Sequence, residues 1–307
     1  MRRTLKDDKL EAEFQREGYV RVPFISPDEV EELKQAYFDG LDKSGGRIGP
    51  EDERFETDSD ITYDFTFIDK NIDYKRQVFD VITKRFESRV SELLADYKPI
   101  IANYIRKKTE GGEVPLHQNW AFVDEHHCAS VSIWCPLVDS DRANGTLEVV
   151  PGSHKRFGEV RGPMIRSELL DIQDDIIKEC MVPCEVKAGE AIILDDSIVH
   201  YSSPNQTEGL RLAIQLILIP NEEQSIHYHM DLSKDRTNVE VLEVDREFYM
   251  TFNPWKKPSE KIHRSKSFSY EPFSLTLPQF KSMLYARRFD EEKASGWKKM
   301  KSKLFGT

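Results

Sequence analysis

The stretch PLHQNWAFVDE, residues 115–125, places a histidine two residues before an asparagine. Because side chains alternate along a strand with a period of two residues, His117 and Asn119 would project from one face of an extended segment. A second histidine, His200, lies in the later stretch LDDSIVHYSS, residues 194–203. Two histidines and one oxygen donor make the facial arrangement that binds non-haem Fe(II) and leaves positions open for a co-substrate and dioxygen. The sequence therefore predicts a metal site formed by His117, Asn119 and His200.

A cation follows the second histidine. Arg211 opens an apolar segment that ends at Pro220, and an unpaired charge buried there would be costly, so it needs an anion. A guanidinium pairs with a carboxylate through two parallel hydrogen bonds, which lysine cannot do. We expect Arg211 to bind the far carboxylate of 2-oxoglutarate, with Ser202 as a second donor. An internal aspartate or glutamate is the alternative partner of this arginine.

Residues 14–220 resemble the phytanoyl-CoA dioxygenase family of Fe(II)/2-oxoglutarate oxygenases. Four blocks in the same order carry the resemblance: FQREGYV (14–20), the His117 block, NGTLEVVPGSH (144–154) and the His200 block. The resemblance implies a double-stranded β-helix, Fe(II), 2-oxoglutarate and dioxygen as reactants, and hydroxylation of an unactivated C–H bond. It also implies that Trp134, Asn103 and Tyr104 lie near the co-substrate.

Asn119 departs from the family pattern, in which this position is usually aspartate. An amide oxygen can coordinate a metal, but it is neutral, so Fe(II) affinity should fall. Three interpretations stay open. The site works with an amide ligand; the change weakens or abolishes turnover and leaves a binding protein; or the site is remodelled for other oxidative chemistry, such as halogenation.

Composition limits the partners. The net charge of −11 over 307 residues argues against nucleic acid or an anionic membrane as the main partner, since both favour basic surfaces. No apolar run approaches the ~18 residues that span a bilayer, and the first residues have no apolar signal-peptide centre. We expect a cytoplasmic protein, monomeric or weakly dimeric, that acts on a small molecule. The four cysteines fit free thiols in a reducing compartment.

The periodicity of apolar residues predicts helices first and strands afterwards. Helices are expected over 11–19, from Pro27 after a Ser26 N-cap, over 74–96 and over 168–179. Strands are expected over 100–106, 114–122, 130–136, 146–150, 184–186, 191–195 and 211–219. The pattern predicts a mainly β fold with flanking helices, a cupin-like jelly roll.

We expect one oxygenase domain over residues 1–307. Its parts would be an N-terminal helical support (1–99), a jelly-roll core with the metal site (100–222) and a C-terminal extension without a known motif (223–307). The polar segment 46–60 is expected to be a loop that borders the mouth of the site. Gln118 is expected to face away from the ligands, and His227 and His229, despite their ligand-like spacing, to lie in a surface loop.

Overall fold

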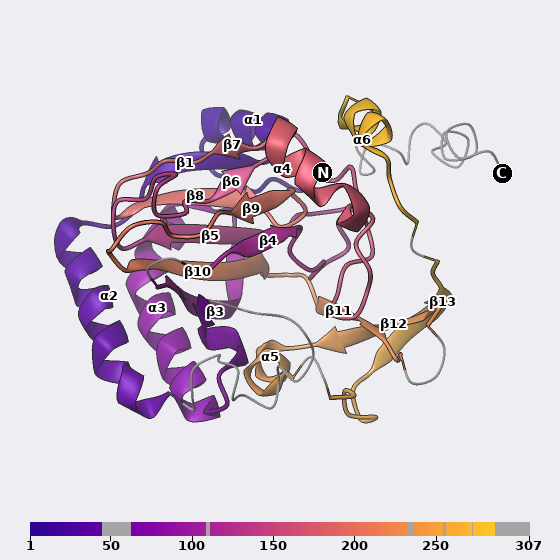
Figure 1. The fold of residues 1–307 in the computed structure, drawn as a ribbon. Helices are drawn as coiled ribbons and strands as arrows, with labels where there is room; N and C mark the ends of the chain where they lie inside the picture. The colour runs from indigo at the N-terminus through magenta and orange to yellow at the C-terminus, as the bar shows by residue number, and fades with distance from the viewer. Residues whose placement is uncertain (45–62, 109–110, 233–235, 254–255, 272, 286–307) are drawn as a thin grey trace.

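The computed structural model describes residues 1–44, 63–108, 111–232, 236–253, 256–271 and 273–285. The predicted loop 46–60 and the lysine-rich end of the chain lie outside these ranges. Within them the chain is mainly antiparallel β with a few helices (Figure 1). This is the jelly-roll architecture that the alternation of strands and turns predicted.

The largest sheet has six antiparallel strands in the order β1-β8-β5-β10-β3-β2. A second sheet has the order β4-β9-β6-β7, and a third has the order β11-β12-β13. Their bounds are β1 Tyr19–Pro23, β2 Tyr63–Phe65, β3 Tyr97–Lys107, β4 Val114–His117, β5 Val131–Pro136, β6 Glu148–Val149, β7 Val182–Pro183, β8 Glu190–Asp195, β9 His200–Ser202, β10 Arg211–Pro220, β11 Ser225–Met230, β12 Asn238–Val244 and β13 Arg264–Ser269.

The helices cover the sheets from outside, and α2 and α3 lie side by side against the six-stranded sheet (Figure 1). They are α1 Asp8–Glu17, α2 Pro27–Gly40, α3 Ile72–Leu93, α4 Gln173–Cys180, α5 Arg246–Thr251 and α6 Leu277–Leu284, with 3-10 turns at Leu41–Lys43, Thr66–Ile68 and Leu170–Ile172. The Ser26 hydroxyl accepts from the backbone N–H of Glu29, and the Glu29 carboxylate accepts from that of Ser26, so α2 begins where its capping box predicts.

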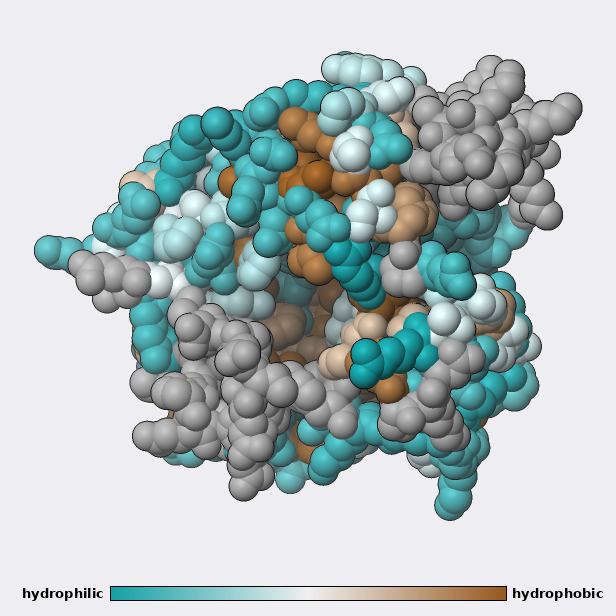
Figure 2. All heavy atoms as spheres, turned by 45° about the vertical axis from the view of Figure 1, so that its right-hand side comes forward, coloured by the Kyte–Doolittle hydropathy of each residue, from teal (hydrophilic) through white to brown (hydrophobic). Residues whose placement is uncertain are grey.

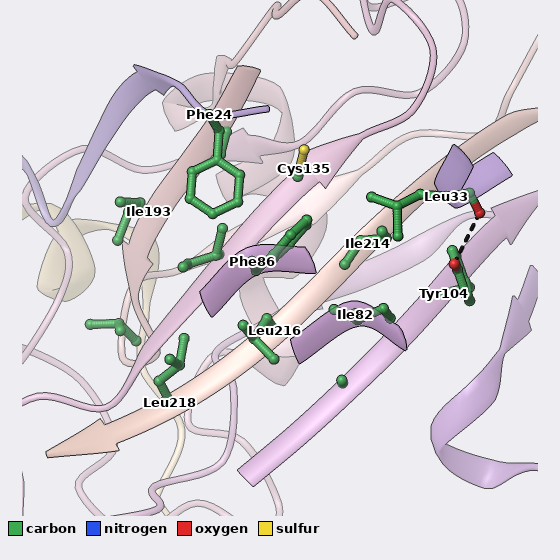
Figure 3. Packing of buried hydrophobic residues seen from close by; sticks show 14 of the residues in the cluster. Phe24, Leu33, Ile82, Phe86, Tyr104, Cys135, Ile193, Ile214, Leu216 and Leu218 are labelled. Carbon is green, nitrogen blue, oxygen red and sulfur yellow. Dashed lines mark hydrogen bonds between the residues drawn. The ribbon is translucent and has the colours of Figure 1, made fainter. Parts of the chain in front are cut away.

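A hydrophobic core fills the space between these helices and the sheet. Ile82 and Phe86 of α3 pack against Ile214 and Leu216 of β10, as Figure 3 shows. Alternate residues of β10 serve the two faces of the sheet, because Gln215 and Ile217 line a cavity on the other side. One face of the six-stranded sheet therefore packs against the helices, and its opposite face lines the cavity.

Several predicted bounds are wrong. The strand expected over 114–122 ends at His117, so Asn119 lies beyond β4. The strand expected over 184–186 is Val182–Pro183, and β9 was not foreseen. The helix expected over 168–179 begins as a 3-10 turn and becomes α-helical at Gln173. Short strands paired over two or three residues carry little periodicity, which explains these errors.

The C-terminal extension is folded. Its three-stranded sheet and α5 enclose an aromatic cluster that includes Trp120, Phe248, Phe252 and Tyr249. His227 lies in β11 at 1% exposure within this cluster, so the prediction of a surface loop for it is wrong. Among the described residues, no helix has both the length and the apolar character to cross a bilayer.

Candidate active site

A cavity of about 310 Å³ lies between the six-stranded sheet and the four-stranded sheet. Its wall is mostly aromatic and aliphatic, and Figure 2 shows the molecule hollowed on one face with hydrophobic residues around the hollow. The polar side chains that reach it are His117, Gln118, Asn119, His200, Tyr201, Ser202, Arg211, Asn103, Ser132 and Gln215. Polar groups concentrated in an apolar chamber are the usual composition of a small-molecule site.

His117 and His200 face each other across the β4–β9 pair. They are register partners, and their ring centroids lie 4.0 Å apart. The Nδ1 of His117 is 2.8 Å from the Pro115 carbonyl oxygen, and the Nδ1 of His200 is 2.9 Å from that of Ile198. Since each carbonyl can only accept, each Nδ1 carries the proton and each Nε2 keeps its lone pair.

Both imidazoles are held neutral. Burial lowers the pKa of His200 well below 6.5, and the neighbouring His117 lowers it further. Burial also lowers the pKa of His117, although the Pro115 carbonyl and the Asn119 side chain raise it in part. A neutral imidazole with a free Nε2 is the form that ligates a metal ion.

Asn119 is oriented by a carboxylate that the sequence interpretation missed. Its Nδ2 donates to Asp196 Oδ1 at 2.8 Å and contacts Ser132 Oγ at 3.0 Å, and the Ser132 hydroxyl donates to the same Asp196 oxygen at 2.6 Å. All three residues are buried. Burial raises the pKa of Asp196 to about 7, against the hydrogen bonds from Ser132 and Asn119 that lower it.

These donors fit a divalent metal. The two Nε2 atoms and the amide oxygen of Asn119 provide two nitrogen ligands and one oxygen ligand at the wall of one cavity. In the described part of the chain, no group of three or more His, Cys, Asp or Glu residues is placed to hold a metal ion. The oxygen donor that lines the cavity beside the two histidines is the amide of Asn119.

Arg211 supplies an unmatched positive charge to the same cavity. Its exposure is 1%, its Nε and Nη1 have no hydrogen-bond partner among the described residues, and burial lowers its pKa to about 9. Its guanidinium carbon lies 5.8 Å from the centre of the Trp134 ring, and both side chains line the cavity. A buried guanidinium with unpaired N–H groups is one that a carboxylate could satisfy, and the binding of 2-oxoglutarate by Arg211 stays a prediction.

Ser202 also lines the cavity, but its hydroxyl proton already takes part in a hydrogen bond within the protein. Its hydroxyl donates to the Gly145 carbonyl at 2.8 Å and accepts from Lys107 Nζ at 2.5 Å. A serine has a single O–H to donate. The expectation that Ser202 donates to a co-substrate is therefore not met by this arrangement.

Neighbouring residues of β3 go to opposite faces. Asn103 lines the cavity, and its Nδ2 lies 3.4 Å from Gln215 Oε1. Tyr104 instead packs in the helical core, where its hydroxyl donates to the Leu33 carbonyl at 3.0 Å (Figure 3). The prediction that Tyr104 contacts a co-substrate is wrong, because a strand cannot present two consecutive side chains to one face.

Gln118 was expected to face away from the ligands, and it lines the cavity instead. Its Nε2 donates to the carbonyls of Phe157 and Ser197 at 2.9 and 2.6 Å. The alternation rule fails because β4 has already ended. Glu125 contributes further support: its carboxylate pairs with Arg161, whose Nε donates to the Asn119 carbonyl at 2.7 Å.

Comparison with known proteins gives a consistent family signal. The family model described as Phytanoyl-CoA dioxygenase (PhyH) matches residues 14–213, about two thirds of the chain. A "Phytanoyl-CoA dioxygenase 1" of Oryza sativa subsp. japonica is 29% identical and covers 71% of this chain and 90% of its own. A "Phytanoyl-CoA dioxygenase domain-containing protein 1 homolog" of Dictyostelium discoideum is 28% identical over 64% of this chain and 70% of its own.

Solved structures share the fold. The non-heme alpha ketoglutarate dependent carbocyclase SnoK from nogalamycin biosynthesis aligns with a TM-score of 0.51 at 18% identity, over 71% of this chain and 86% of its own. EvdO2 from Micromonospora carbonacea var. aurantiaca, complexed with 2-oxoglutarate, aligns with a TM-score of 0.50 at 24% identity. The alignment covers 69% of this chain and 90% of EvdO2. At these identities the similarity is one of architecture.

Proposed function

The chain belongs to the phytanoyl-CoA dioxygenase family, and from that premise we propose that it is an Fe(II)- and 2-oxoglutarate-dependent dioxygenase that hydroxylates an unactivated C–H bond of a small molecule. One observation carries the proposal. The Nε2 atoms of His117 and His200 share a cavity with Arg211, a buried cation whose Nε and Nη1 have no hydrogen-bond partner among the described residues.

The roles of the residues follow from their positions. His117, His200 and the amide oxygen of Asn119 would hold Fe(II), and Arg211 would bind the far carboxylate of 2-oxoglutarate. When bound, Fe(II) would let dioxygen oxidise 2-oxoglutarate to succinate and CO2 and the substrate C–H bond to C–OH, with one oxygen atom going to each product. The protein contributes the placement of these reactants and the exclusion of water from them.

The cavity wall indicates the kind of substrate. Beyond the polar side chains, aromatic residues enclose the site, among them Phe65, Phe67, Trp120 and Phe122. A C–H bond presented there would sit in apolar surroundings, so the reacting part of the substrate should be apolar. The solved structures of similar fold include one with 2-oxoglutarate bound, which supports the co-substrate assignment.

We place the enzyme in the cytoplasm, as a monomer or weak homodimer. The support is chemical: Cys128, Cys135, Cys180 and Cys184 are all free thiols, and three of them are buried. Free thiols persist in reducing compartments.

The competing function is that of a binding protein that retains 2-oxoglutarate but turns over slowly, and the neutral ligand Asn119 is the observation that favours it. The two functions differ in one product. An enzyme releases succinate from 2-oxoglutarate in the presence of dioxygen, whereas a binding protein does not.

The first experiment is an anaerobic titration of Fe(II) into the apoprotein with 2-oxoglutarate present. The weak visible absorption band of the Fe(II)–2-oxoglutarate chelate should appear and saturate at one Fe(II) per chain. The variants His200→Ala and Arg211→Leu should lose it. Absence of both the band and Fe(II) binding in the unaltered protein would contradict the proposed function.

A further inference from the structure

Asn119 and Asp196 form a buried pair in which one side chain is a metal ligand and the other is its only carboxylate contact among the described residues. Asn119 Nδ2 lies 2.8 Å from Asp196 Oδ1, and Ser132 Oγ donates to the same oxygen at 2.6 Å. The exposures of Asp196 and Ser132 are 0% and 1%. The two residues are remote in sequence, so the pair is a product of the fold.

The pair fixes which end of the amide faces the metal site. Asp196 Oδ1 accepts a hydrogen bond from the Ser132 hydroxyl, so it acts as an acceptor here. The amide of Asn119 must therefore present its NH2 group to Asp196. The Asn119 oxygen then points away from Asp196, and Asn119, His117 and His200 all line the same cavity. The hydrogen bond therefore fixes the amide with its NH2 group toward Asp196 and its oxygen away from it.

The pair also transmits charge. An amide whose N–H donates to a carboxylate gains electron density on its oxygen, and the effect is stronger in a low-dielectric interior. An ionised Asp196 would therefore hold, one hydrogen bond behind the amide, the unit of negative charge that a neutral ligand fails to bring to a divalent metal.

We infer that Asp196 is a positioning residue that completes the metal centre by orienting and polarising the amide ligand Asn119. The metal centre would then have the same total charge as a centre of two histidines and one carboxylate. The difference is that the carboxylate, Asp196, lies behind the amide ligand instead of contacting the metal. This inference rests on the proposed function, because it concerns the same metal site.

Neighbouring carboxylates have other roles. Asp195 Oδ1 accepts from the backbone N–H and the hydroxyl of Ser197 at 2.8 and 2.5 Å, so it closes the turn after β8. Glu125 is paired with Arg161 at 2.5 Å. Asp195 is buried, adjacent in sequence and not bonded to Asn119, which makes it the matched control for a general charge effect.

The test measures Co(II) affinity of the apoprotein anaerobically, by calorimetry and by the visible ligand-field spectrum. Asp196→Asn removes the charge but keeps an oxygen that can accept from both Asn119 and Ser132, so the fold should survive. We expect Co(II) binding to weaken about 10- to 100-fold, the usual cost of losing a residue that supports a metal ligand. Asp195→Asn should change the affinity less than about threefold.

A second variant keeps the test decisive if Asp196→Asn fails to fold. Asn119→Asp combined with Asp196→Asn exchanges the amide and the carboxylate and keeps the hydrogen bond between them. Co(II) affinity should be at least that of the unaltered protein, and a lower affinity would overturn the inference.

The remaining outcomes separate the inference from the proposed function. If the unaltered protein binds Co(II) and Asp196→Asn binds it equally well, or if both aspartate variants weaken binding to the same extent, Asp196 has no specific role and the inference is wrong. If the unaltered protein binds neither Co(II) nor Fe(II), the metal site itself is wrong.

Discussion

Arg211 lies over the Trp134 ring at 5.8 Å, and the Nε and Nη1 of this arginine have no hydrogen-bond partner in the described part of the chain. The aromatic face holds the guanidinium in place without using its N–H groups. Burial without an anion lowers the pKa of Arg211. The ligand-free protein therefore contains an electrostatic cost that a bound carboxylate would relieve.

Arg211→Leu should remove this cost and the binding site together. We expect 2-oxoglutarate to bind the Co(II)-loaded variant roughly 30- to 100-fold more weakly, the loss expected for charge-assisted hydrogen bonds worth ~2–3 kcal/mol. The thermal midpoint of the ligand-free variant should equal or exceed that of the parent. Calorimetric titration with 2-oxoglutarate measures the first effect, and differential scanning calorimetry the second.

The control is Arg21→Leu, which removes a surface arginine paired with Glu190. It should leave 2-oxoglutarate affinity unchanged. Parental affinity in Arg211→Leu would show that the co-substrate binds elsewhere.

The spacing of His117 and His200 and the cost of burying the charge of Arg211 can be read locally, and the structure brings these three side chains to one cavity. Asp196 could not be predicted in this way, because no local pattern indicates a hydrogen bond to a residue as distant as Asn119. Sequence reasoning misplaced Gln118 and Tyr104 because both assignments required the bounds and facing of strands, which follow from pairing between distant segments. The fold class can be predicted correctly despite such errors, whereas the residues that line a site cannot.

His227 was misjudged for a related reason. It lies beyond the residues that carry the family resemblance, yet Trp120, Phe248 and Phe252 enclose it. These residues come together only in the folded chain. The C-terminal extension thus supplies part of the packing behind Trp120, which lines the cavity.

The buried pair of Glu125 and Arg161 should be sensitive to removal of one partner. Glu125→Gln leaves the Arg161 charge buried and uncompensated, and we expect it to lower the free energy of unfolding by ~3–5 kcal/mol. Replacing both, as Glu125→Leu with Arg161→Met, should cost less than Glu125→Gln alone. Urea denaturation measures all three proteins.

A matched control is Glu190→Gln, since Glu190 pairs with Arg21 at the surface and such pairs contribute ~0–1 kcal/mol. If Glu125→Gln costs no more than Glu190→Gln, the buried pair does not carry the stability assigned to it. The same conclusion would follow if the double variant Glu125→Leu with Arg161→Met were less stable than Glu125→Gln.

His227 should make stability depend on pH. Burial lowers its pKa from 6.5 to about 3, so between these values the unfolded chain binds a proton that the folded chain does not. Stability therefore rises with pH across this window and is lost on acidification, by about 2 kcal/mol from pH 7 to pH 5 for this group. His227→Phe, which suits the aromatic surroundings, should lose that contribution.

The measurement is chemical denaturation of the parent and His227→Phe at several pH values between 5 and 8. The difference between their free energies of unfolding should grow in favour of the variant as the pH falls. A pH-independent difference for His227→Phe would mean that His227 does not titrate as stated.

Asn119→Asp recreates the ligand usual in the family, yet the structure predicts a penalty for it. The new carboxylate would face Asp196 Oδ1 where Asn119 Nδ2 now donates at 2.8 Å. Two carboxylates at that separation cannot both ionise cheaply, and the hydrogen bond is lost. We expect the metal-free variant to unfold with a free energy on the order of 2–3 kcal/mol lower at pH 8.

Adding Asp196→Asn to Asn119→Asp should restore that stability, because the carboxylate and the amide then hydrogen-bond again with their positions exchanged. Urea denaturation of the metal-free proteins compares the parent, the single variant and the double variant. Since a divalent metal screens the two carboxylates from each other, it should also stabilise Asn119→Asp more than the parent. Equal stability of the three metal-free proteins would mean that the charge of Asp196 does not act on position 119. Aspartate at 119 would then only replace a neutral ligand by a charged one.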